Sequence, residues 1–214
     1  MKNTFLEKSC TEKIKKGNKM SLLIKNTKIW FKNNFSVKNV FCENGKIKKI
    51  SDSAKEIQTE NVIDAEGKFL LPGGIDSHVH FREPGMKEKG NWKSESSAAV
   101  AGGITTVIEM PNTIPPTTTV SALQEKREIA GKNSLVNFGF HFGATKEKLE
   151  EIRKAENVAS VKVFMGSSTG NLLVEEEKVL EEIFRTAKEK NLTVVLHAEE
   201  EKIIKKNLKE AKKK

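Results

Sequence analysis

The sequence predicts an α/β fold: an incomplete TIM-type (β/α) barrel with about five of the usual eight strands, preceded by a small antiparallel β-sandwich portion. Two observations lead to this prediction. Up to about Leu71, short strand-like runs are separated by turn residues. From Gly73 onwards, strand-like and helix-like segments alternate, which indicates parallel strands joined by right-handed crossovers.

We therefore expect three parts. Residues 1–19 are rich in lysine and show no clear period, so they are expected to be a disordered extension, with Met20 rather than Met1 as the natural start. Residues 20–71 would form the N-terminal part of a small β-sandwich domain. Residues 72–214 would form the first part of the barrel, which is truncated.

In the first part, an Asn-Gly pair gives the strongest hairpin signal. Asn44-Gly45 lies between two runs that alternate polar and apolar residues, and Pro72 is expected to end the sheet. The expected strands are Ser21–Asn26, Val37–Cys42, Lys46–Ile50, Asn61–Asp64 and Gly67–Gly73.

In the second part, caps and glycines set the expected helix ends. Gly102-Gly103 would end the first helix, Ser121 and Gln124 could form a capping box that opens the second, and Thr145 would cap the third. The expected strands are Ile75–Phe81, Thr105–Met110, Val136–Phe142, Val161–Met165 and Thr193–Ala198. The expected helices are Trp92–Ala101, Ser121–Gly131, Lys146–Ala155, Glu175–Lys190 and Glu199–Lys214.

Composition argues against several classes of partner. The net charge is +9, but 34 lysines against 4 arginines, mostly alternating with glutamate along helices, are typical of solvated helix faces and not of a nucleic-acid footprint. Only Cys10 and Cys42 occur, which favours a reducing compartment. No apolar run approaches a membrane span or a signal-peptide core, so we expect a cytoplasmic protein with no membrane partner.

Two histidines at the end of the first barrel strand are the sharpest chemical signal. His78 and His80 are two residues apart, so in a strand their imidazoles lie on one face and could bind a metal ion. Asn112 follows the second strand and His197 ends the fifth, at the barrel end where active sites lie. Lys162 lies within the fourth strand, and its pattern alone leaves open whether the side chain points into the barrel or outward between helices.

These residues stand in longer motifs by which the chain resembles a known family. It is similar to the amidohydrolase superfamily, and within it to the cyclic-amide hydrolases, most closely the dihydroorotases. The resemblance covers about residues 20–214 in the correct order. The matching segments are Pro72–Gly85, Gly102–Thr106, Met110–Thr113, Lys162–Gly170 and His197–Glu199.

This resemblance implies a hydrolase with two divalent metal ions, usually zinc. His78 and His80 would bind the first ion, His197 the second, and Lys162 would carry a CO₂-derived carbamate that bridges both. Arg82 and Asn112 would bind the substrate carboxylate. The implied reaction is the interconversion of N-carbamoyl-L-aspartate and dihydroorotate in pyrimidine biosynthesis, with a small cyclic amide as partner and a homo-oligomer for the full-length family.

Arg82 also bears on the choice within the family. Similar allantoinases typically carry asparagine here, and hydantoinases lack the Phe81–Gly85 run, which favours the dihydroorotase type over both. Asp76 is expected to play a supporting structural role beside the histidines, and His141 to be a hydrogen-bonded barrel histidine.

The chain departs from the family pattern after His197. The family's site needs a further histidine and a catalytic aspartate, but no histidine follows His197 and the aspartates are Asp52, Asp64 and Asp76. No catalytic residue is therefore assigned, and we expect an inactive fragment of the dihydroorotase type. The alternatives are an allantoinase- or hydantoinase-type amidase and a non-catalytic, truncated amidohydrolase-like subunit; truncated gene, split gene and incomplete sequence stay open.

Overall fold

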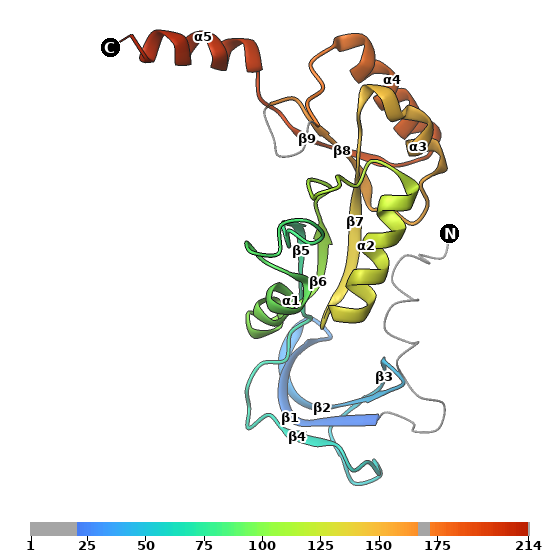
Figure 1. Cartoon of the computed structure of the whole chain (residues 1–214). Helices are drawn as coiled ribbons and strands as arrows, with labels where there is room; N and C mark the ends of the chain where they lie inside the picture. The colour runs from blue at the N-terminus through green and yellow to red at the C-terminus, as the bar shows by residue number, and fades with distance from the viewer. Residues whose placement is uncertain (1–20, 167–171, 214) are drawn as a thin grey trace. The chain divides into compact units, whose positions relative to one another are not determined.

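A computed structural model describes residues 21–166 and 172–213 of the chain (Figure 1). It divides into two compact units, one ending at Pro72 and the other continuing from Gly73. The predicted extension over residues 1–19 lies outside the described residues, as does the part of the fourth motif over residues 167–170.

The first unit is one sheet with the strand order β3-β2-β1-β4. Its strands are β1 (Ser21–Phe31), β2 (Asn34–Glu43), β3 (Lys46–Ser51) and β4 (Val62–Asp64). The β1–β2 and β2–β3 pairs are antiparallel, as predicted. The fourth strand is not: β4 pairs with β1 in parallel, with Leu23 opposite Val62. The chain can make this pairing because residues 52–61 form a connection long enough to return it to the start of the sheet.

Two strands of this sheet differ from the prediction for local reasons. The first runs on from Asn26 to Phe31, because Asn26 takes a φ of 55° and forms a bulge that the strand passes through. Lys32 and Asn33, both at positive φ, then form a two-residue turn into β2 that composition alone did not indicate. The expected strand Gly67–Gly73 is reduced to an isolated bridge between Lys28 and Phe69.

The second unit is built on a five-stranded parallel sheet with sequential order, which confirms the predicted fold class. Its strands are β5 (Gly74–Val79), β6 (Ile104–Glu109), β7 (Asn137–Gly143), β8 (Ser160–Phe164) and β9 (Thr193–His197). The helical segments are α1 (Trp92–Ala101), α2 (Val120–Asn133), η1 (Lys146–Lys148), α3 (Leu149–Lys154), α4 (Glu177–Glu189) and α5 (Glu201–Ala211). Helix α1 packs against β6, α2 against β7 and α4 against β9, whereas α5 projects away from the sheet (Figure 1).

Helix ends differ from the prediction where a different residue provides the cap. Helix α1 has the predicted bounds and ends at Gly102. Helix α2 begins after Thr119, whose Oγ1 accepts the N–H of Ala122 at 3.2 Å, so the expected Ser121 capping box is wrong. It also continues through Gly131 to Asn133. The single helix expected over Lys146–Ala155 is a 3₁₀ turn followed by α3, and the Thr145 side chain makes no cap hydrogen bond.

The core of this unit contains a cluster of aromatic rings. Trp92 is fully buried and lies edge-on to Phe81, Phe138 and Phe140, with ring centroids 4.8–5.8 Å apart. The cluster anchors α1 and the turn after β5 to the middle of the sheet, so it fixes the segment that follows the two histidines.

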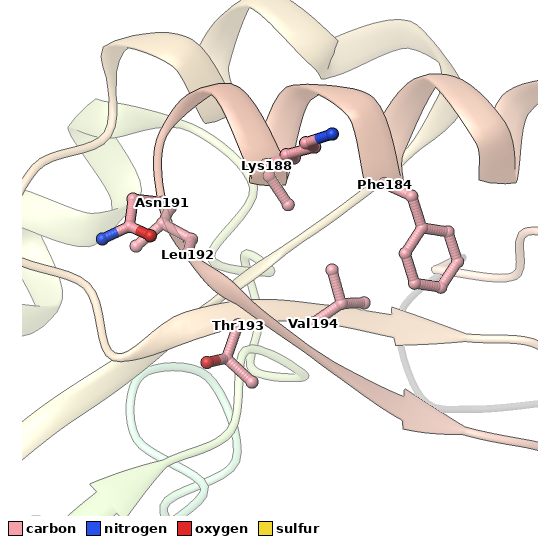
Figure 2. Close-up of a pocket in the computed structure, with 7 residues that line it drawn as sticks. Phe184, Lys188, Asn191, Leu192, Thr193 and Val194 are labelled. Carbon is pink, nitrogen blue, oxygen red and sulfur yellow. The ribbon is translucent and has the colours of Figure 1, made fainter.

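The two end strands of the sheet are exposed, unlike β8, which is buried along its whole length. Ile75 on β5 is 65% exposed and Leu196 on β9 is 40% exposed. Beside β9, the face of α4 forms the wall of an open pocket of about 460 Å³, lined by residues that include Phe184, Leu192 and Val194 (Figure 2). Within the described residues, no helix is long and apolar enough to span a membrane.

Candidate active site

The two predicted histidines lie side by side at the end of β5. His78 is in the strand and His80 directly follows it, and their ring centroids are 5.3 Å apart. Burial, followed by the positive charge of Lys162, lowers the pKa of His78. Burial, followed by the charge of Arg82, lowers the pKa of His80. Both rings are therefore neutral at pH 7, which is the form that binds a metal ion.

Lys162 lies on the same side of the sheet as these histidines. Its charge lowers the pKa values of both His78 and His80, so the structure favours the orientation toward them over the outward alternative. The residue is 1% exposed, and its Nζ lies 5.1 Å from the centroid of the Phe164 ring. Burial lowers the pKa of Lys162. None of the ion pairs among the described residues includes it.

His197 ends β9, which pairs with β8, the strand that carries Lys162. In the parallel register it stands opposite Phe164, and the two rings have centroids 6.1 Å apart. Its charge also acts on His78, so both histidines and the lysine are within electrostatic reach of one another. His197 is partly exposed, and its Nε2 lies 3.3 Å from Oε1 of Glu199. Electrostatic interactions thus link His78 to both Lys162 and His197, and His80 to Lys162.

Arg82 lies in the segment that follows the end of β5. The strand ends at Val79 and Arg82 has a φ of 66°, so alternation along a strand does not place it. It lies in a turn that packs closely on the loop after β6: a Cβ added to Gly85 would lie 2.1 Å from the carbonyl oxygen of Ile114. This close approach requires glycine and brings Arg82 near the loop that carries Asn112.

Asn112 makes a contact that sequence reasoning missed. Its side chain is 6% exposed, and its Oδ1 lies 2.8 Å from Nδ1 of His80. Because an amide oxygen can only accept, Nδ1 of His80 carries the hydrogen and its Nε2 has a free lone pair. An asparagine three residues after the end of a strand gives no sequence signal for such a bond.

Two further residues behave as supports. Asp76 accepts the backbone N–H of His78 through Oδ1 at 3.0 Å, which supports a structural role beside the histidine. His141 lies 2.6 Å from the Ser160 hydroxyl and 2.8 Å from the carbonyl oxygen of Ser77, and burial lowers its pKa. Both of its ring nitrogens are therefore occupied by hydrogen bonds, and it ties β5, β7 and β8 together instead of offering a ligand.

Sequence reasoning also missed a buried ion pair at this end of the sheet. Glu109, the last residue of β6, pairs with Lys126 of α2, and each is at most 1% exposed. A signal was available, since Lys126 lies on the same helix face as the buried Leu123 and Ala130. A lysine in an apolar stripe either extends its side chain to solvent or pairs with a buried acidic group, and Lys126 pairs with Glu109.

Comparisons with known proteins show the family to which this chain belongs. The model of the amidohydrolase family matches residues 69–214. The chain belongs to the amidohydrolase family. It is 46% identical to a dihydroorotase of Methanosarcina acetivorans over 182 residues, which are 84% of this chain and 39% of that protein. It is 35% identical to an L-hydantoinase of Paenarthrobacter aurescens over 86% of this chain and 41% of that protein.

Solved structures similar to this amidohydrolase chain are hydantoinases. An L-hydantoinase (dihydropyrimidinase) from Arthrobacter aurescens superposes with a TM-score of 0.83 and 34% identity, covering 89% of this chain and 43% of that one. A D-hydantoinase crystal structure gives a TM-score of 0.75 at 31% identity, covering 90% and 43%. The chain thus spans about two fifths of the length of the relatives it matches.

Proposed function

We propose that this chain provides the N-terminal metal- and substrate-binding part of a cyclic-amide hydrolase of the dihydroorotase type, which interconverts dihydroorotate and N-carbamoyl-L-aspartate. The observation that carries the proposal is Lys162, a buried lysine without an ion-pair partner among the described residues, beside two neutral histidines. An unpaired ammonium is costly in such a place, and conversion to an anionic carbamate removes that cost.

The donor set fits divalent metal ions only with that carbamate. Among the described residues, no three His, Cys, Asp or Glu side chains are close enough to hold an ion. Addition of CO₂ to the neutral amine of Lys162 forms an N–C bond and releases one proton, leaving two carboxylate-like oxygens. His78, His80 and His197 would then hold the ions together with these oxygens. When bound, ions such as zinc would activate a water molecule and polarise the amide carbonyl.

The substrate-binding residues support the dihydroorotase type. Both N-carbamoyl-L-aspartate and dihydroorotate carry a carboxylate outside the reacting amide, and Arg82 offers a guanidinium that can bind it through two hydrogen bonds. Asn112 would bind the same carboxylate through its amide N–H₂, since its oxygen accepts from His80. The dihydroorotase relatives at 40–46% identity favour the same substrate.

A second candidate is a hydantoinase-type amidase, favoured by the superposition on the L-hydantoinase with a TM-score of 0.83. Its uncharged ring would leave the guanidinium of Arg82 without an anionic partner, so we place this candidate second. A non-catalytic subunit would hold metal ions or none, and would turn over neither substrate.

Substrate choice can be tested in a chimera in which residues 21–213 replace the matching part of the Methanosarcina acetivorans dihydroorotase. Supplied with zinc and bicarbonate, it is expected to hydrolyse dihydroorotate in preference to hydantoin and allantoin. Preferential turnover of either uncharged ring would contradict the dihydroorotase assignment.

In the same chimera, Arg82→Ala is expected to reduce kcat/KM for dihydroorotate by about 10²-fold or more, since a site built around a charge-assisted pair is left unpaired. Hydantoin turnover should change little. The matched control is Arg185→Ala, which removes an exposed arginine of α4. Equal losses on both substrates would show that Arg82 supports the fold and does not select the carboxylate.

A further inference from the structure

The buried pair Glu109–Lys126 has no part in the function proposed above, yet Glu109 contacts Phe81, the residue after His80. Besides the ion pair, Nζ of Lys126 donates to the carbonyl oxygen of Met110 at 2.9 Å and lies 5.9 Å from the centroid of the Phe140 ring. Burial raises the pKa of Glu109 to about 7 and lowers the pKa of Lys126. Each side chain is only 1% exposed, so both groups are removed from water.

Such a pair is a poor source of net stability. The cost of desolvating two charges offsets most of their attraction, and apolar residues of similar volume often serve as well or better. A Leu or Met at position 126 would continue the apolar face formed by Leu123 and Ala130. The pair is therefore better explained by the segments that it holds in place than by a gain in stability.

The pair joins the two segments that carry His80 and Asn112. The Glu109 carboxylate accepts a hydrogen bond from the backbone N–H of Phe81, the residue after His80. Lys126 holds the carbonyl of Met110, two residues before Asn112. The N–H of Met110 donates in turn to the carbonyl of Val79, the residue before His80, at 2.9 Å. These contacts hold the residues on either side of His80 and the segment that leads to Asn112.

The hydrogen bond between His80 and Asn112 depends on the relative position of these two segments. Asn112 Oδ1 and His80 Nδ1 are 2.8 Å apart, so a relative shift of the two segments by about 1 Å would exceed hydrogen-bonding distance. With the bond in place, His80 is held as the Nδ1–H tautomer and its Nε2 lone pair is available. Without it, the ring is free to adopt the Nε2–H tautomer, in which that nitrogen cannot bind a metal ion.

We propose that Lys126 and Glu109 are positioning residues, which clamp the ends of β5 and β6 together so that Asn112 holds His80 in the Nδ1–H tautomer. The consequence for metal binding rests on the proposed function, whereas the tautomer itself does not. Neither residue touches the substrate in this arrangement; both act through the backbone segments on either side of the His80–Asn112 bond.

The tautomer can be read from ring ¹⁵N resonances of the metal-free, full 214-residue chain near neutral pH. The chain has four histidines, and His80 is assigned by the signal lost in His80→Gln. The wild-type protein is expected to show the Nδ1–H form of His80. Lys126→Met, which removes the ammonium, is expected to show a mixture with the Nε2–H form. Lys132→Met, an exposed lysine on the same helix, should leave His80 unchanged.

Two further variants separate positioning from general destabilisation. Glu109→Gln keeps the shape of the side chain while removing its charge, so it serves if Lys126→Met does not fold, and a smaller shift of the same kind is expected. Ile183→Ala creates a cavity in the buried face of α4 and lowers the unfolding midpoint, but it should leave the His80 tautomer unchanged. Retention of the Nδ1–H form in both Lys126→Met and Glu109→Gln would overturn the proposal, as would loss of that form in Ile183→Ala.

Zinc titration of the same proteins tests the link to the site. Lys126→Met is expected to weaken the tightest zinc site by about 10–100-fold, the usual effect of losing a group that orients a metal-binding histidine. A changed tautomer with unchanged zinc affinity would overturn the link to metal binding. Failure of the chimera to hydrolyse dihydroorotate would contradict the proposed function alone, because the tautomer is measured without metal or substrate.

Discussion

Lys162→Met is expected to abolish hydrolysis by the chimera, with a loss of at least the ~10²–10³-fold that removal of a single preorganised electrostatic group typically costs. The variant keeps the length and apolar character of the side chain but removes the nitrogen that would react with CO₂. Since no three His, Cys, Asp or Glu side chains converge among the described residues, the loss of this group should also remove most metal binding.

The carbamate can be observed directly. In ¹³C-bicarbonate, the wild-type protein is expected to show a protein-bound carbamate signal that depends on zinc, and Lys162→Met should lack it. Lys188→Met, an exposed lysine on α4, is the matched control and should keep both the signal and the activity. A carbamate signal that survives in Lys162→Met would show that another lysine reacts, and the assigned role would be wrong.

The second large effect concerns the 214-residue chain by itself. We expect no measurable dihydroorotate hydrolysis from it, while the chimera turns the substrate over. The physical reason lies in the two ends of the parallel sheet. Among residues 21–166 and 172–213, strands β5 and β9 each have a neighbour on one side only, and they leave unpaired N–H and C=O groups beside exposed apolar side chains such as Ile75 and Leu196.

Such edges also predict self-association, which light scattering after size exclusion measures. Leu196→Lys places a charge on β9 and is expected to increase the monomeric fraction. Val100→Lys, at a 50% exposed apolar position on helix α1 and so not on a strand edge, is the control and should have a smaller effect. A monomeric wild-type chain that hydrolyses dihydroorotate at ordinary enzyme rates would show that the exposed edges do not limit it.

Local signals predicted the parallel sheet well and the small sheet less well. Strand and helix periods gave all five strands of the second unit to within two residues, because each is a short apolar run closed by glycine, proline or a cap. The parallel pairing of β4 with β1 was missed because it depends on which strand β4 pairs with. The local sequence of β4 does not specify that partner. The bulge at Asn26 was missed for a related reason, since pairing with β2 carries the strand through it.

By itself, the sequence determined the fold class, the family and the set of metal-binding candidates, because residue type and spacing are enough to define the motifs around His78 and Lys162. Only the tertiary structure showed that Lys162 is buried and acts electrostatically on His80, that Asn112 contacts His80, and that Glu109 and Lys126 form a buried pair. Contacts between residues 17 or 32 positions apart, as in these last two cases, arise from packing between strands and helices. A strand or helix period describes only one element at a time, so it carries no information about such contacts.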